Sequence, residues 1–210
     1  MGRPREHDEH TRAELRAAAE RLVATGGPDA LTVRAVAAEV GTTTRAIYSV
    51  FGSKDALVAT LAEQAFDLLR TGIDELPETE DPVDDLIEAG ATMYRSFVRE
   101  HPSLFRIAFQ RIVPELTLGP ELTEARARAW ARLEAKVRRL EDAGLLGTLS
   151  VNEAAVAFNA LCEGLGNAEL RGGTLRQLPA DQGERVWREA FETLVRGFNT
   201  AGSARSPAGR

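Results

Sequence analysis

The side chains that most often carry catalytic or metal chemistry are few in this sequence and stand far apart. The histidines are His7, His10 and His101, and the single cysteine is Cys162. The spacing of His7 and His10 can hold a metal ion, although a solvated, charged chain end explains the pair more simply. Because no nucleophile–base pair and no complete ligand set stands out, we predict no catalytic residue, no metal site and no cofactor.

Two other motifs also have simple structural explanations. Gly164-Leu165-Gly166 contains the glycines of a phosphate-binding loop, but no predicted strand precedes it. Asp84-Asp85 is a carboxylate pair, and acidic residues of this kind stabilise the positive end of a helix. An enzyme is therefore the less favoured class of function.

Residues 31–49, which contain several threonines and a glycine, show a pattern that indicates a function. Residues 31–40 and 43–49 read as two short helices, with Thr32 and Thr43 as N-caps and Gly41 in the turn. A small apolar core can fix the angle between them, formed by Val36, Ala37, Val40, Ile47 and Val50. This is the pattern of a helix-turn-helix, whose second helix can enter the major groove of DNA.

Residues 11–60, roughly, resemble the TetR family of one-component regulators. The resemblance rests on an amphipathic first helix and on four blocks that follow it. The blocks are Leu31-Thr32-Val33-Arg34-Ala35-Val36-Ala37, Val40-Gly41, Ala46-Ile47-Tyr48-Ser49-Val50-Phe51 and Ser53-Lys54-Asp55-Ala56-Leu57. The chain departs from the family at Thr42, where an apolar residue is usual, and at Arg45, where Gly or Pro is common. The operator sequence therefore cannot be read from the family pattern.

The resemblance implies a double-stranded DNA operator as partner and assigns roles within the two helices. The residues facing the base edges would be Thr44, Arg45 and Ala46, and an arginine can bond both acceptors of a guanine. The residues contacting phosphates would be Thr43, Tyr48 and Lys54, because hydroxyls and ammonium groups suit phosphate oxygens. Arg34 would contact a base or a phosphate.

Arg3 and Arg5 would form an arm in the minor groove. Each assignment that rests on a single side chain has an alternative. Tyr48 could pack at a helix end, Arg34 could be a solvated charge, and the two N-terminal arginines could belong to an idle tail.

Composition indicates an all-α protein, because helix-forming Ala, Leu, Glu and Arg dominate a chain with 43% hydrophobic and 28% charged residues. Bases and acids balance over residues 1–60, so the net charge of −6 arises from the remainder. The first residues lack the apolar run of a signal peptide, and no segment approaches the roughly 18 apolar residues of a membrane helix. We therefore expect a cytoplasmic protein with no membrane partner.

Periodicity predicts helices along the whole chain, with acidic residues 74–85 as a loop and Asp81-Pro82 opening a helix that runs without a break to about His101. Ser150-Val151-Asn152-Glu153 is a capping-box pattern and begins a further helix. The domain prediction is a helix-turn-helix domain at 1–56, a ligand-sensing and dimerisation domain at 57–200, and a disordered tail at 201–210. The stretch from His101 to Phe109 also resembles a segment of one group of TetR-type C-terminal domains.

A pocket for a small-molecule effector is implied for the second domain. Its predicted apolar lining consists of Phe66, Met93, Phe97, Phe105, Phe109, Trp130 and Phe158, and its predicted polar groups are Tyr94, Gln110 and Asn159. The alternative is that these residues only fill a core. Asn159 interrupts an apolar run, so its amide needs a partner: a ligand, a neighbour or a second subunit.

The last two long helices, 151–171 and 181–200, are the predicted homodimer interface. The interface residues would be Ala157, Ala160, Gly164, Ala168, Phe191, Leu194, Val195 and Phe198. A two-fold dimer predicts a palindromic operator with reading helices about 34–36 Å apart. The resemblance to the TetR family implies a repressor, and we expect it to be released from this operator by a small, largely apolar molecule. The alternative is a helical interaction module, or a small-molecule-binding protein without regulated DNA binding.

Overall fold

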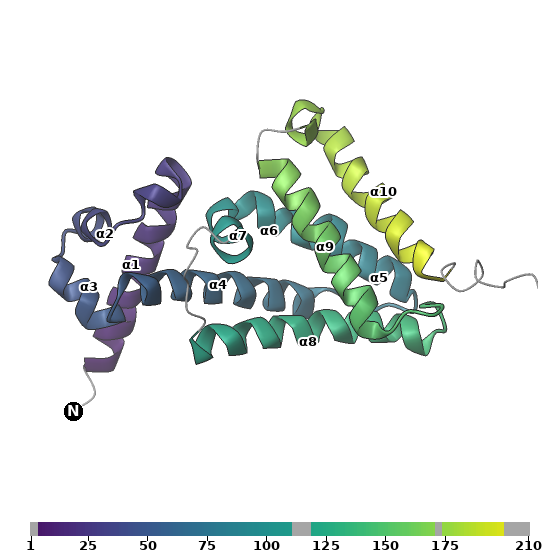
Figure 1. Cartoon of the computed structure of the whole chain (residues 1–210), viewed down its shortest axis with the longest axis horizontal. Coiled ribbons are helices and arrows are strands. Elements are labelled where there is room, and N and C mark those ends of the chain that lie inside the picture. The colour runs from purple at the N-terminus through teal and green to yellow at the C-terminus, as the bar shows by residue number, and fades with distance from the viewer. Residues whose placement is uncertain (1–3, 111–118, 171–173, 200–210) are drawn as a thin grey trace, which may run out of the picture. The chain divides into compact units, whose positions relative to one another are not determined.

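The computed structural model describes residues 4–110, 119–170 and 174–199, and every regular element in these ranges is a helix (Figure 1). The predicted all-α fold is confirmed. The described part of the chain contains no helix that is long and apolar enough to cross a membrane. The predicted tail at 201–210 and Arg3 lie outside the described residues.

The chain forms two compact units that do not follow sequence order. The first unit contains residues up to Asp67 together with His101–Arg126, and the second contains Leu68–Glu100 and the residues from Ala127 onward. Residues 101–110 and 119–126 therefore group with the predicted DNA-binding residues, whereas the domain division, which stays a prediction, puts them in the second domain.

The first unit is built from short helices around a small core. Its elements are α1 (Pro4–Gly26), η1 (Pro28–Ala30), α2 (Val33–Val40), α3 (Thr44–Phe51), the first part of α4 (Lys54–Glu75), α7 (Pro102–Phe109) and the start of α8 (Pro120–Asp142). The fully buried side chains include Leu15 of α1, Val36 of α2 and Ile47 of α3. These apolar positions recur at helical spacing, and their burial fixes the angles between the helices.

Polar caps set the helix boundaries of this unit. The hydroxyl of Thr32 accepts a hydrogen bond from the amide of Ala35, and the hydroxyl of Thr43 accepts one from the amide of Ala46. Gly41 has a φ of 71°, the left-handed conformation that follows many helices. The predicted caps are confirmed, although α4 runs on to Glu75, into residues expected to form a loop.

The second unit contains the rest of α4 and α8 and two long C-terminal helices. Its other elements are α5 (Pro82–Glu88), the π-helical η2 (Ala89–Tyr94), α6 (Arg95–Glu100), α9 (Val151–Leu170), η3 (Thr174–Gln177) and α10 (Ala180–Phe198). Sequence periodicity predicted one unbroken helix where α5, η2 and α6 follow one another. A Cβ atom on Gly90 would lie 2.5 Å from the ring of Phe191, so this glycine lets α10 pack directly on the backbone of η2.

Two predicted helix starts of the second unit are confirmed by their hydrogen bonds. Asp81 accepts from the amides of Val83 and Asp84 at the start of α5. At the start of α9, Ser150 and Glu153 form a reciprocal capping box, in which each side chain accepts from the other residue's amide.

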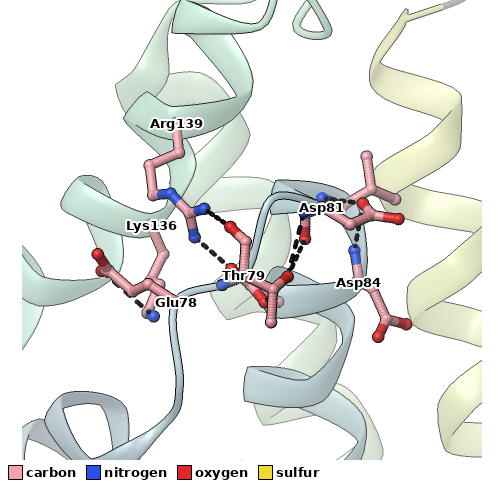
Figure 2. A network of polar contacts seen from close by, with 8 residues as sticks. Glu78, Thr79, Asp81, Asp84, Lys136 and Arg139 are labelled. Atoms are coloured by element: carbon pink, nitrogen blue, oxygen red, sulfur yellow. Dashed lines mark hydrogen bonds and ion pairs between the residues drawn. The ribbon is translucent and has the colours of Figure 1, made fainter.

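A ladder of ion pairs joins α8 to the end of α4 and the loop after it, and Figure 2 shows the contacts that Lys136 and Arg139 make with this loop. Arg132 pairs with Asp74 at 2.8 Å, and Lys136 pairs with Glu78 at 3.4 Å. One turn further, Arg139 donates to the Asp85 carboxylate and to the backbone carbonyl of Thr79. We call these contacts the α8 ladder.

Asp85 is the most enclosed acid of the α8 ladder. Its carboxylate is buried and also accepts hydrogen bonds from the amide and the hydroxyl of Thr79, at 2.9 and 2.8 Å. Burial alone would raise the pKa of Asp85, but the hydrogen bonds from Arg139 and Thr79 outweigh it and hold this pKa below its ordinary value. The charged form of Asp85 therefore stabilises the folded state.

We expect Asp85→Asn to lower the free energy of unfolding by about 2–3 kcal/mol at neutral pH, because the charge-assisted bonds to Arg139 are lost. Since folding depresses this pKa, the contribution of Asp85 is complete above the unfolded-state pKa of about 4 and disappears as the pH falls through the folded-state pKa. Urea unfolding followed by circular dichroism at several pH values would measure both effects.

Asp84→Asn is the matched control, because its side chain is 62% exposed and its contact with Arg188 is long, at 3.9 Å. This control should change stability by no more than about 0.5 kcal/mol. Equal losses from the two substitutions would contradict the role given to Asp85.

Candidate nucleic-acid interface

Helix α3 has one face turned into the protein and one turned to solvent. Ile47 and Phe51, one turn apart, are buried, whereas Arg45, Tyr48 and Ser49 are exposed. The N-terminal end of α3 is therefore not packed inside the first unit, as an ordinary core helix would be. Its outward face is available to a partner such as a DNA groove.

The leading end of α3 combines a capped backbone with an exposed cation. The Thr43 hydroxyl oxygen accepts from the Ala46 amide at 3.2 Å, which leaves the hydroxyl hydrogen available to an acceptor outside the chain. Thr44 and Ala46 are half-buried, and Arg45 between them is exposed. Arginine next to a helix N-terminus suits the acceptor atoms of base edges and phosphates.

Three other predicted DNA contacts, Tyr48, Arg34 and Lys54, also lie on the surface of the first unit. Tyr48 is 51% exposed, so it does not pack as a core residue at the helix end. Arg34 on α2 is exposed, and so is Lys54, the first residue of α4. Arg5 falls in the first turn of α1, and the minor-groove arm remains a prediction.

Sequence reasoning missed two residues near this surface. Ser49 shares the outward face of α3, and its position next to Tyr48 was the available signal. Arg12 of α1 contacts the end of α3. No local pattern links residues so far apart in the sequence.

The predicted effector-pocket residues fall into both units. In the first unit, Phe109 contacts the rings of Phe66 and Phe105, with centroid distances of 5.6 and 5.3 Å, and Gln110 follows at the end of α7. The second unit holds Met93, Tyr94, Phe97, Trp130, Phe158 and Asn159. Phe105 is fully buried, as a core residue would be.

Two polar side chains among these candidates, Asn159 and Trp130, have hydrogen-bond partners within the chain. The Asn159 side-chain amide donates to Glu163 at 2.7 Å, and the Trp130 indole donates to Glu134 at 3.0 Å. Of the three partners predicted as possible for the Asn159 amide, a neighbouring residue is the one observed. Burial is the main cause that raises the pKa of the Tyr94 phenol well above its ordinary value, and Coulombic interactions with Cys162 and Glu163 add to it. Tyr94 therefore remains a neutral hydroxyl.

The predicted dimer-interface residues divide by exposure. Phe191, Val195 and Phe198 are buried within the chain itself, and Phe191 packs on Phe158 with a centroid distance of 4.8 Å. These three residues fill the subunit's own core and offer a second copy little surface. Ala160 and Gly164 are exposed, and Ala157, Ala168 and Leu194 are half-buried. Val156, which sequence reasoning missed, is an exposed apolar side chain on α9.

Comparison with solved structures gives close matches of fold over most of the chain. A protein of unknown function from Rhodococcus sp. RHA1 is 25% identical, with a TM-score of 0.72 over 89% of this chain and 94% of that one. The TetR-family transcriptional regulator PfmR from Thermus thermophilus is 22% identical, with a TM-score of 0.65 over 87% and 97%. The fatty acid degradation regulator FadR from Bacillus halodurans is 16% identical, with a TM-score of 0.71 over 88% and 94%.

Comparison with protein families gives matches in both halves of the sequence. A search of curated protein sequences finds no match. Residues 15–61 match the bacterial regulatory proteins of the tetR family, and residues 87–194 match the tetracyclin repressor-like C-terminal domain. Together these regions include α2, α3 and the exposed face of α3 described above. The chain belongs to the TetR family and is a DNA-binding transcriptional regulator.

Proposed function

We propose that this regulator is a homodimeric repressor that leaves a palindromic operator when it binds a small, largely apolar effector. The observation that carries the proposal is the outward face of α3, where Arg45 and Tyr48 are exposed while Ile47 and Phe51 anchor the helix. A helix held in this way can enter a major groove without losing its own packing. As a regulator of DNA it would act in the cytoplasm.

Direct reading of the operator is assigned to Thr44, Arg45 and Ala46. Arg45 is the principal reader, because its guanidinium can donate to both O6 and N7 of a guanine. Thr44 and Ala46 can contact thymine methyl groups at short range, since their side chains are small. Arg34, Thr43, Tyr48 and Lys54 set the register through phosphates, and Arg34 can also reach a base.

Self-association is assigned to the exposed face of α9. Val156, Ala160 and Gly164 follow one another at intervals of four residues and therefore share one side of the helix. The small residues permit close approach of a second helix, and Val156 supplies apolar area that is 51% exposed in the single chain. A two-fold axis through this face would pair two α3 helices with one palindrome.

Release by an effector is assigned to movement of α4. This helix begins at Lys54, a proposed phosphate contact, and its last turn contains Asp74, which the α8 ladder holds. An effector that favours a different position of α4 would weaken DNA binding, and coupling of this kind is typically worth about 1–3 kcal/mol.

Selection of duplexes from a random pool by the purified protein, followed by gel shift on the upstream DNA of its own gene, would test operator binding. A palindromic duplex bound by two chains is the expected result. A panel of apolar carboxylic acids, alcohols and aromatic compounds should then contain a compound that releases the duplex. Absence of any selected duplex would overturn the proposal.

We expect Arg45→Ala to remove most discrimination between the selected duplex and a scrambled one, a loss of about 1–3 kcal/mol. Lys54→Ala should instead weaken both duplexes equally and lower the salt slope by about one phosphate equivalent. Fluorescence anisotropy titrations at several KCl concentrations would measure both quantities. If Arg45→Ala kept full discrimination, α3 would not be reading bases as proposed.

Val156→Glu should weaken self-association by at least about tenfold, because the new carboxylate would be buried without a partner. Analytical ultracentrifugation over a concentration series would measure the change. Ala131→Glu is the matched control, since it adds the same charge at an exposed position on α8. A dimer that tolerates both substitutions would place the interface elsewhere.

A further inference from the structure

Arg12 of α1 joins the C-terminal end of α3. Its Nη2 atom donates a hydrogen bond of 3.1 Å to the carbonyl oxygen of Val50. Its guanidinium carbon also lies 5.2 Å from the centroid of the Phe51 ring, the last residue of α3. One side chain thus contacts both the backbone and the side chain of the final turn.

These contacts suit the chemistry of a helix end. The last carbonyl groups of a helix lack partners within it, and the helix dipole places partial negative charge there. A guanidinium satisfies one such carbonyl and brings the opposite charge. Phe51 is itself buried, so the ring beneath the guanidinium is fixed, and an arginine over an aromatic face gains a further cation–π attraction.

The contacts of Arg12 with the C-terminal end of α3 matter because this helix is short. It has eight residues and is therefore about 12 Å long, too short to be stable or to keep its direction alone. Val50 lies five residues after Arg45, which corresponds to about 7.5 Å along the axis. A tilt of α3 at its C-terminal end would therefore move Thr44, Arg45 and Ala46, the proposed base-reading residues.

The charge of Arg12 also has a counterpart within the first unit. Burial raises the pKa of Glu63 on α4, and the positive charges of Arg16 and Arg12 oppose that rise. Arg12 therefore acts electrostatically on a carboxyl group of α4 while it contacts α3.

We propose that Arg12 is a positioning residue for DNA recognition, which fixes the direction of α3 and so sets sequence discrimination without touching the DNA. The proposal rests on the proposed reading of an operator by α3. It differs from a phosphate-contact role, because a phosphate contact would strengthen binding to every duplex alike.

The test compares Arg12→Lys and Arg12→Met with wild type, using a duplex selected by the wild-type protein and the same duplex with scrambled base order. Arg12→Lys keeps the charge but loses the planar fork that bonds Val50 and covers Phe51 together. Both variants should lower the ratio of the two affinities, by about tenfold for Arg12→Met, with little change in scrambled-duplex affinity or salt slope. Arg16→Lys, one turn further along α1, is the control and should leave the ratio unchanged.

A measurement without DNA separates this proposal from the function on which it rests. Hydrogen exchange of the amides of residues 50–52 should be faster in Arg12→Lys than in wild type, and unchanged in Arg16→Lys. Unchanged exchange in Arg12→Lys would overturn the positioning role. The positioning role would also be overturned if Arg12→Met weakened binding to both duplexes equally and lowered the salt slope by about one, because that result identifies a phosphate contact. If exchange were faster in Arg12→Lys but the wild-type protein selected no duplex, Arg12 would still anchor the C-terminal end of α3. Its role in DNA reading and the operator function would then both be overturned.

Discussion

The direction of one eight-residue helix is the constraint on which the proposed reading of DNA depends. Helix α3 cannot fix its own orientation, because so short a segment is marginal as a helix in water. Two buried residues, Ile47 and Phe51, attach one side of it to the first unit, and Thr43 closes its N-terminal end. The side chains that remain outside are therefore presented at a defined angle, which base contacts require.

The sequence was sufficient to predict features whose causes are local. The caps Thr32, Thr43 and Asp81, the left-handed Gly41 and the capping box at Ser150 each depend on residues within a few positions of one another. Such signals can be read without knowledge of the rest of the fold. The same holds for the amphipathic spacing that identified α3 and placed Ile47 inside, although the second buried residue of this helix is Phe51 and the predicted core residue Val50 is only half-buried.

Features that depend on contacts between distant residues were not predictable. The π segment η2 contains Gly90, on which Phe191 packs from about a hundred residues later, and helical periodicity carries no trace of that contact. The grouping of α7 with the first unit has a similar origin, since His101 contacts Glu20 of α1 at 3.5 Å. For the same reason, three residues predicted for the dimer interface are buried within the subunit, where Phe191 meets Phe158.

The charged residues of the second unit show why net charge was a weak guide to partners. Three cations on α8 that could have contributed to a basic surface are paired within the chain: Arg132 with Asp74, Lys136 with Glu78 and Arg139 with Asp85. These pairs hold the last turn of α4 and the loop after it. An acidic chain can thus bind a polyanion when its cations are divided between internal pairs and a few exposed positions such as Arg45.

The reactivity of the single cysteine decides whether this regulator can respond to oxidants or electrophiles through a thiol. Cys162 is buried on α9, and burial raises its pKa well above the ordinary value, so almost none of it is thiolate at neutral pH. The thiolate is the form that reacts with peroxides and electrophiles. Oxidative stress therefore has no ready target at this side chain in the folded protein. For the experimenter, a cysteine introduced on the surface should accept a fluorescent or spin label with little background reaction.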